Sequence, residues 1–252
     1  MNGSAGLDQK IDARRQLQSL FATAQLGYNE FVYLDLSARN DWSSTLAYTS
    51  HEKSGFFYPS VGFSLIFNKL MTLPRWVSLA KIRGAYSMVG NDIPMFITNP
   101  SSHITAGGEF LASDAAPFKD MEPEMTHSFE AGIEARFLKN RIGLNATFYK
   151  TNTRNQFFKL PTLSGDKYAY RYVNAGDIQN VGWEISLDAV PLLTNHFKWK
   201  TEVNFSTNRN KIISLHEALK EFLYGPTSFS SSYAMKLVKG GSIGDIYGKA
   251  FV

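Results

Sequence analysis

The sequence predicts an all-β protein whose long antiparallel strands form part of a transmembrane β-barrel. In residues 128–137 every second side chain is apolar, and the positions between them are polar, charged or glycine. Successive side chains of a strand point to opposite faces, so this ribbon has one apolar and one charged face. About ten tilted strand residues span a membrane, whereas soluble strands usually have 5–6. The predicted connections alternate between short turns and long loops, as in outer-membrane barrels.

The same alternation recurs along most of the chain. We expect about eight long strands in hairpin order, near residues 16–26, 31–39, 57–67, 77–87, 125–137, 142–149, 181–189 and 197–206. Short connections are expected at residues 27–30, 68–75, 138–141 and 191–196, and longer loops at 40–55, 88–123 and 155–177. The tail from Asn208 is predicted to be a loop with one helical turn at residues 216–222. A final short strand follows Gly240 and Gly241.

The composition supports this fold class and excludes others. The 252 residues are 44% hydrophobic, yet no segment approaches the roughly 18 consecutive apolar residues of a transmembrane helix. Aromatic residues make up 14% of the chain, which suits the girdles of a barrel. The absence of cysteine excludes disulfides and cysteine-based sites. The net charge of +4 is scattered, so nucleic-acid binding is not predicted.

A soluble secreted β-rich domain, such as an adhesin or a carbohydrate-binding module, is the alternative. Any half-buried antiparallel sheet alternates apolar and polar residues. The length of the strands and the charges in the middle of them favour the barrel. These charged residues are Lys81, Arg83, Glu130, Glu134 and Arg136.

Short motifs in a fixed order give the sequence a family resemblance. The segments that carry them are residues 36–44, 57–64, 81–91, 124–132, 140–141, 149–153, 173–184, 197–199, 208–211 and 240–248. In order and spacing they resemble the SusC/RagA-like TonB-dependent outer-membrane receptors. Each motif is weak alone, but together they cover nearly the whole chain.

The resemblance implies a cell outer membrane location in a Gram-negative bacterium and a 22-stranded barrel with a plug in its lumen. It implies uptake of an oligosaccharide or peptide nutrient. The implied partners are a SusD-like surface lipoprotein, outer-membrane lipid and, through the plug, the TonB–ExbB–ExbD complex. Residues 1–13 would be a linker or loop, and residues 14–252 a partial barrel domain without plug, signal peptide or C-terminal strands. A truncated receptor fragment without independent activity is a further alternative.

No catalytic, metal or cofactor residue is predicted, and the chain is not expected to be an enzyme. The histidines show no ligand spacing; they are His51, His103, His127, His196 and His216. Glu130 and Glu134 share a strand face but lie about 13 Å apart, too far for paired acid–base work. Substrate-binding residues stay unassigned, and the loops at 90–123, 155–177 and 211–239 are where contacts with substrate or lid are expected.

Two further groups of residues receive structural interpretations. Asn174, Gly176, Asn180 and Gly182 are predicted to serve backbone geometry where loops join strands, with a ligand role as the alternative. Aromatic residues near strand ends are predicted to anchor the membrane interfaces, in preference to stacking on sugars. They are Trp42, Tyr58, Tyr168, Tyr170, Tyr172, Trp183 and Trp199.

Overall fold

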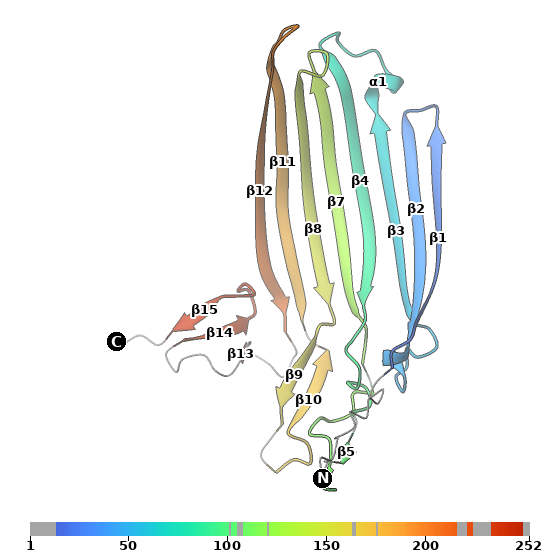
Figure 1. Cartoon of the computed structure of the whole chain (residues 1–252), viewed down its shortest axis with the longest axis vertical. Helices are drawn as coiled ribbons and strands as arrows, with labels where there is room; N and C mark the ends of the chain where they lie inside the picture. The colour runs from blue at the N-terminus through green and yellow to red at the C-terminus, as the bar shows by residue number, and fades with distance from the viewer. Residues whose placement is uncertain are drawn as a thin grey trace, which may run out of the picture.

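The computed structural model describes residues 14–100, 102–104, 108–119, 121–162, 165–174, 176–215, 221–223 and 233–248. Its main feature is an eight-stranded antiparallel sheet in which the strands follow each other in chain order (Figure 1). The strands are β1 (Leu17–Tyr28), β2 (Val32–Ser43), β3 (Phe56–Ile66), β4 (Val77–Asn91), β7 (Glu124–Phe137), β8 (Ile142–Arg154), β11 (Asp177–Leu193) and β12 (Lys198–Ser214). The predicted all-β fold with long antiparallel strands is confirmed.

Short and long connections lie at opposite ends of this sheet. At the end drawn uppermost in Figure 1, β1–β2, β7–β8 and β11–β12 are joined by tight turns, and β3–β4 by a segment that contains α1 (Phe67–Leu70). Asn29 and Glu30 make the first turn with positive φ angles of 46° and 56°. The other end carries the 3₁₀ turn η1 (Ser44–Leu46) and the small strands β5 (His103–Ile104), β6 (Phe110–Leu111), β9 (Phe157–Pro161), β10 (Tyr170–Asn174), β13 (Glu221–Leu223), β14 (Tyr233–Val238) and β15 (Ile246–Gly248).

The register gives the sheet one apolar and one polar face. A typical apolar row runs across five strands through Ile82, Ile133, Ala146, Ile185 and Phe205. The adjacent row, on the opposite face, consists of Lys81, Glu134, Asn145, Ser186 and Asn204. Because strand side chains alternate with a period of two, each row fixes the face of every other residue in its strands.

The apolar face is exposed rather than packed. Its exposed large side chains include Leu20, Leu26, Leu36, Phe57, Val61, Phe63, Phe129, Ile133, Trp183, Leu187, Trp199, Val203 and Phe205. Soluble monomers rarely expose an apolar patch of this extent, which marks contact with a membrane or a partner. Among the described residues, no helix is long and apolar enough to cross a membrane.

The buried cores lie at the long-loop end of the sheet, on the side of its polar face. Cluster 1 consists of Phe158, Leu160, Ile178, Ile212 and Leu237. Cluster 2 consists of Leu46, Phe56, Ile93, Ile97 and Met121. Phe56, Ile178 and Ile212 share their strand faces with Ser60, Gly182 and Asn208, which places both clusters on the polar side.

Several predicted boundaries are wrong, and the largest errors give too little strand, although the strand predicted at residues 57–67 includes Phe67, which begins α1. Strand β2 continues to Ser43, β4 to Asn91 and β12 to Ser214, because backbone pairing continues where hydropathy no longer alternates. The predicted helical turn at residues 216–222 is a strand where it is described, at Glu221–Leu223, and residues 216–220 lie outside the described residues. The first predicted loop, residues 1–13, lies outside them as well.

Candidate functional site

The polar face is lined by charged side chains that reach across neighbouring strands. Arg83 on β4 passes over Gly132 of β7 and donates to Thr147 Oγ1 at 2.6 Å and Asn145 Oδ1 at 3.3 Å, both on β8. A Cβ atom at Gly132 would lie 2.7 Å from Arg83 Nε, so the glycine leaves room for this crossing. This part of the polar face therefore presents the Arg83 guanidinium together with neutral hydrogen-bonding groups on the neighbouring strand β8.

Two acidic groups on this face, Glu134 and Asp188, form ion pairs with Arg136. Arg136 Nε lies 3.5 Å from a Glu134 carboxylate oxygen, and Arg136 Nη1 lies 3.9 Å from a carboxylate oxygen of Asp188 on β11. Glu130 and Glu134 share one face, as predicted, four residues apart. Partly exposed pairs of this kind contribute little stability, so their main effect is to set the charge pattern of the face.

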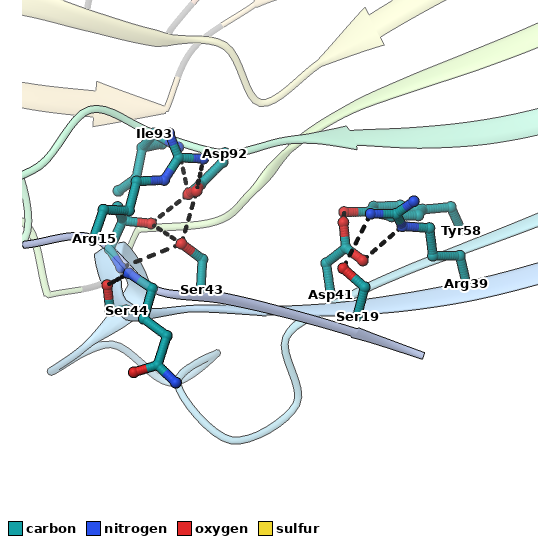
Figure 2. A network of polar contacts seen from close by, with 11 residues as sticks. Arg15, Ser19, Arg39, Asp41, Ser43, Ser44, Tyr58, Asp92 and Ile93 are labelled. Carbon is teal, nitrogen blue, oxygen red and sulfur yellow. Dashed lines mark hydrogen bonds and ion pairs between the residues drawn. The ribbon is translucent and has the colours of Figure 1, made fainter. Parts of the chain in front are cut away.

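A second polar network lies where β1, β2 and β3 approach the loops (Figure 2). Arg39 Nε donates to Asp41 Oδ1 at 2.7 Å, and Tyr58 Oη donates to Asp41 Oδ2 at 2.8 Å. Arg39 also donates to Ser19 Oγ on the neighbouring strand at 3.0 Å. Asp41 is buried, and these donors satisfy both of its oxygens.

Asp92 holds the start of the long loop after β4 against the entrance of β1 (Figure 2). Its carboxylate lies 2.5 Å from Arg15 Nη2 and accepts hydrogen bonds from Ser43 Oγ at 2.7 Å and the Ile93 backbone amide at 2.8 Å. The Thr45 hydroxyl donates to Oδ1, which also accepts from the Ile93 amide, whereas Arg15 and Ser43 both bind Oδ2. Three separate segments are thus fixed by one side chain.

The β9–β10 hairpin lies between the two buried clusters. Phe158 and Leu160 on one of its faces belong to cluster 1, whereas Phe157 and Tyr172 on the other pack on cluster 2. Lys159 Nζ lies 3.5 Å from the centre of the Tyr170 ring. Burial, with a smaller contribution from Tyr170, raises the pKa of the Tyr172 phenol. The hairpin therefore links the loops into one packed unit.

Asn174 joins this hairpin to two other segments. Its Oδ1 accepts from the Glu122 amide at 2.7 Å, and its Nδ2 donates to the carbonyls of Glu122 at 2.8 Å and Asn155 at 2.6 Å. Gly176 follows with a φ of +89°. The predicted role of these two residues in backbone geometry is confirmed.

Asn180 and Gly182 lie within β11 and contact its two neighbouring strands. Asn180 Oδ1 accepts from Asn208 at 3.1 Å and from Asn210 at 3.0 Å, both on β12. Gly182 lies against Tyr149, whose hydroxyl would be 2.5 Å from a Cβ atom there. The predicted place of this pair at a junction of loop and strand is wrong, because both residues lie inside β11 (Asp177–Leu193), where they connect neighbouring strands.

The predicted aromatic anchors separate into two groups. Trp183 and Trp199 lie exposed on the apolar face, as anchors would, and Trp42 Nε1 donates to the Lys53 carbonyl at 3.0 Å. The predicted anchoring at the membrane interface is wrong for three tyrosines, which lie on the polar face or in the folded loops. Tyr58 binds Asp41, and Tyr170 and Tyr172 pack in the hairpin, with ring centres 5.9 Å apart.

No histidine or acidic cluster gathers into a metal site among the described residues. Tyr86 Oη and His127 Nδ1 lie 2.8 Å apart on the apolar face. His51 and His196 lie in separate connections, and only the backbone of His103 is described. His216 falls outside the described part of the chain.

Comparison with known proteins identifies the family. The family model described as TonB dependent receptor-like, beta-barrel, matches residues 2–225. A TonB-dependent receptor of Formosa agariphila is 25% identical over 208 residues, which are 79% of this chain and 20% of that protein. The TonB-dependent receptor SusC of Bacteroides thetaiotaomicron is 25% identical over 227 residues, 81% of this chain and 22% of SusC.

Among solved structures, the RagAB peptide importer in its open-open state superposes with a TM-score of 0.76 at 22% identity. The match covers 90% of this chain and 24% of that one, and it supports the fold. This chain thus spans between a fifth and a quarter of these related proteins. TonB-dependent receptors are outer-membrane transporters of Gram-negative bacteria. With the family model matching most of its length, the chain belongs to the TonB-dependent receptor β-barrel family, and SusC is among its relatives.

Proposed function

We propose that residues 14–252 form part of the barrel wall of a longer outer-membrane transporter that takes up an oligosaccharide or peptide nutrient. One observation carries the proposal: the family match over residues 2–225 coincides with a sheet whose apolar face is exposed and whose other face is polar. In such a barrel the apolar face contacts lipid and the polar face lines the lumen.

The position of the loops supports the direction of transport. Both buried clusters lie on the polar side at the long-loop end, so the packed loops stand beside the mouth of the lumen. Long loops of outer-membrane barrels are extracellular, whereas short turns are periplasmic. Substrate would therefore meet the loops at 90–123, 155–177 and 211–239 first. Within these ranges, residues 101, 105–107, 120, 163–164, 175, 216–220 and 224–232 lie outside the described part.

The partners belong to the proposal as well. RagAB is a peptide importer, and its likeness to this chain makes peptide one of the two candidate substrates. A SusD-like surface lipoprotein would deliver substrate from above, and TonB–ExbB–ExbD would act through a plug encoded elsewhere in the longer protein. No catalytic role is proposed for the chain.

Deletion of the complete gene tests this function. The deletion strain should lose energised uptake of one class of oligosaccharide or peptide, complementation should restore it, and a strain lacking TonB should show the same loss. Mass spectrometry of purified outer membranes should find these residues in a protein about four to five times as long. Uptake that continues unchanged without the gene, or a native short species in a soluble fraction, would contradict the proposal.

A further inference from the structure

The loop end of the sheet carries a small groove between η1 and the segment after β4. It has a volume of about 270 Å³. Its lining residues are Arg14, Ser44, Thr45, Ala47, Tyr48, Met95, Phe96, Thr98 and Asn99. We propose that this groove binds one acidic sugar unit of an incoming oligosaccharide. This inference rests on the proposed transport function and names one substrate class for it.

Two aromatic side chains in the groove are held outward by unusual backbone geometry. Tyr48 has a φ of 69° and is 68% exposed, and Phe96 has a φ of 68° and is 49% exposed. Bulky residues rarely adopt a positive φ, and they do so where the surrounding structure fixes the backbone. Here the neighbours Leu46 and Ile97 are buried in cluster 2, which fixes both turns.

The two walls of the groove are tied together beneath these rings. The buried Thr98 hydroxyl donates to the Thr45 carbonyl at 3.2 Å, and the Thr45 hydroxyl donates to Asp92. The Tyr48 amide donates to Glu52 Oε2 at 2.9 Å. The groove is therefore built before any ligand arrives, which lowers the entropic cost of binding.

The chemistry of the lining selects the ligand. Arg14 is the charged residue among the nine, and no acidic residue lines the groove, so an anionic group is favoured. A guanidinium can bind a carboxylate or a sulfate with two parallel hydrogen bonds. Ser44 and Asn99 add a hydroxyl and an amide for ligand hydroxyls, and the exposed rings offer apolar faces to a sugar ring.

A peptide fits this site less well. Peptides are commonly bound by main-chain pairing along a strand edge, and none of the nine lining residues belongs to a strand. The volume lies just below the roughly 300–1,000 Å³ of pockets for drug-sized ligands. It suits a single sugar ring, with the remainder of the oligosaccharide extending over the loops.

Calorimetric titration of the full-length receptor in detergent tests the site. The probes are an oligogalacturonate tetrasaccharide, a carrageenan-derived sulfated tetrasaccharide, neutral maltotetraose and an acidic tetrapeptide. At least one acidic saccharide should bind. Tyr48→Gly and Phe96→Gly should each weaken its binding about tenfold, because glycine accepts the positive φ and removes the ring. Arg14→Gln should remove the preference for the acidic over the neutral saccharide.

Two controls separate binding from folding. Tyr48→Phe keeps the ring and should retain affinity for the saccharide. Phe110→Ala removes an exposed loop aromatic that is not among the lining residues, and it should retain affinity as well. The inference is overturned if neither acidic saccharide binds, if binding survives both glycine variants, or if those variants reduce peptide binding instead. If the Tyr48→Gly receptor still binds the saccharide normally and energised uptake continues, the groove proposal is rejected and the transport function stands. If binding depends on the groove residues but the saccharide is not taken up in a TonB-dependent way, the transport function is rejected and the groove proposal stands.

Discussion

Gly182 is a position on the polar face where a methyl group would meet backbone. A Cβ atom there would overlap the Thr207 carbonyl oxygen and lie 2.5 Å from Tyr149 Oη. The Tyr149 hydroxyl donates to that same carbonyl at 3.4 Å, so the ring has little freedom to move. We expect Gly182→Ala to destabilise the barrel by about 1–3 kcal/mol. The measurement is the unfolding temperature of the detergent-purified full-length receptor.

Gly132 provides the matched control for this substitution. Its nearest neighbour is Arg83 Nε at 2.7 Å, which belongs to a long side chain that can rotate away. Gly132→Ala should therefore cost less stability than Gly182→Ala. An equal loss in the two variants would show that overlap with backbone is not the cause.

The β9–β10 hairpin is joined to two other segments by one side chain, that of Asn174. Asn174→Asp replaces an amide that donates to the carbonyls of Glu122 and Asn155 with an oxygen that repels them. We expect a loss of about 1–2 kcal/mol of local stability. Hydrogen exchange should become faster at the amides of β9, and the long strands should be unaffected. Arg171→Gln, an exposed change on the same strand, should leave the exchange of β9 unchanged.

The two faces of strand β7 should respond differently to the same new charge. Ile133 lies on the apolar face, between Ile82 and Ala146, and is exposed. Ile133→Arg should destabilise the barrel in lipid by about 2–4 kcal/mol, the cost of an arginine at mid-membrane depth. Glu130→Arg, on the polar face of the same strand, should have a much smaller effect. Denaturant titration in lipid vesicles measures both, and equal losses would contradict the assignment of the faces.

The long strands were predictable because one physical signal repeats along them. Alternation of apolar and polar residues in β7 or β11 follows directly from lipid on one side and water on the other. The signal fails at the strand ends: β12 continues through Thr207, Arg209 and Lys211, which occupy positions of the apolar face but are polar. There the strand is held by backbone pairing and by amides such as that of Asn180, which no hydropathy pattern reveals.

At the scale of the whole molecule, the loop assembly could not be read from the sequence. Ile212, Leu237 and Phe158 pack in one cluster, although they come from three segments that are far apart in the sequence. No repeating hydrophobic pattern connects these segments, so the sequence does not indicate that they pack together. The groove beside η1 depends on the same long-range packing, because Leu46 and Ile97 fix the turns of Tyr48 and Phe96. Four of the nine lining residues lie in the predicted loop at 88–123 and four in the predicted loop at 40–55, and nothing in the sequence indicates that these two loops meet.

The sheet as a whole is open within the described part of the chain. Strand β1 pairs with β2 and β12 with β11, and each leaves its outer edge without a strand partner among the described residues. Unpaired edges and an exposed apolar face both favour aggregation in water, and lipid does not tolerate open edges. We therefore expect residues 1–252, expressed alone, to aggregate without detergent and to be absent from the outer membrane.

The same residues within the full-length receptor should be found folded in the outer membrane, because neighbouring strands then close both edges. Protease protection and heat-dependent migration on electrophoresis distinguish the two forms. A soluble, monomeric product of residues 1–252 that unfolds cooperatively in water would contradict this expectation. It would mean that the apolar face is covered from within the chain, and the sheet would then belong to a soluble β-domain rather than to a barrel wall.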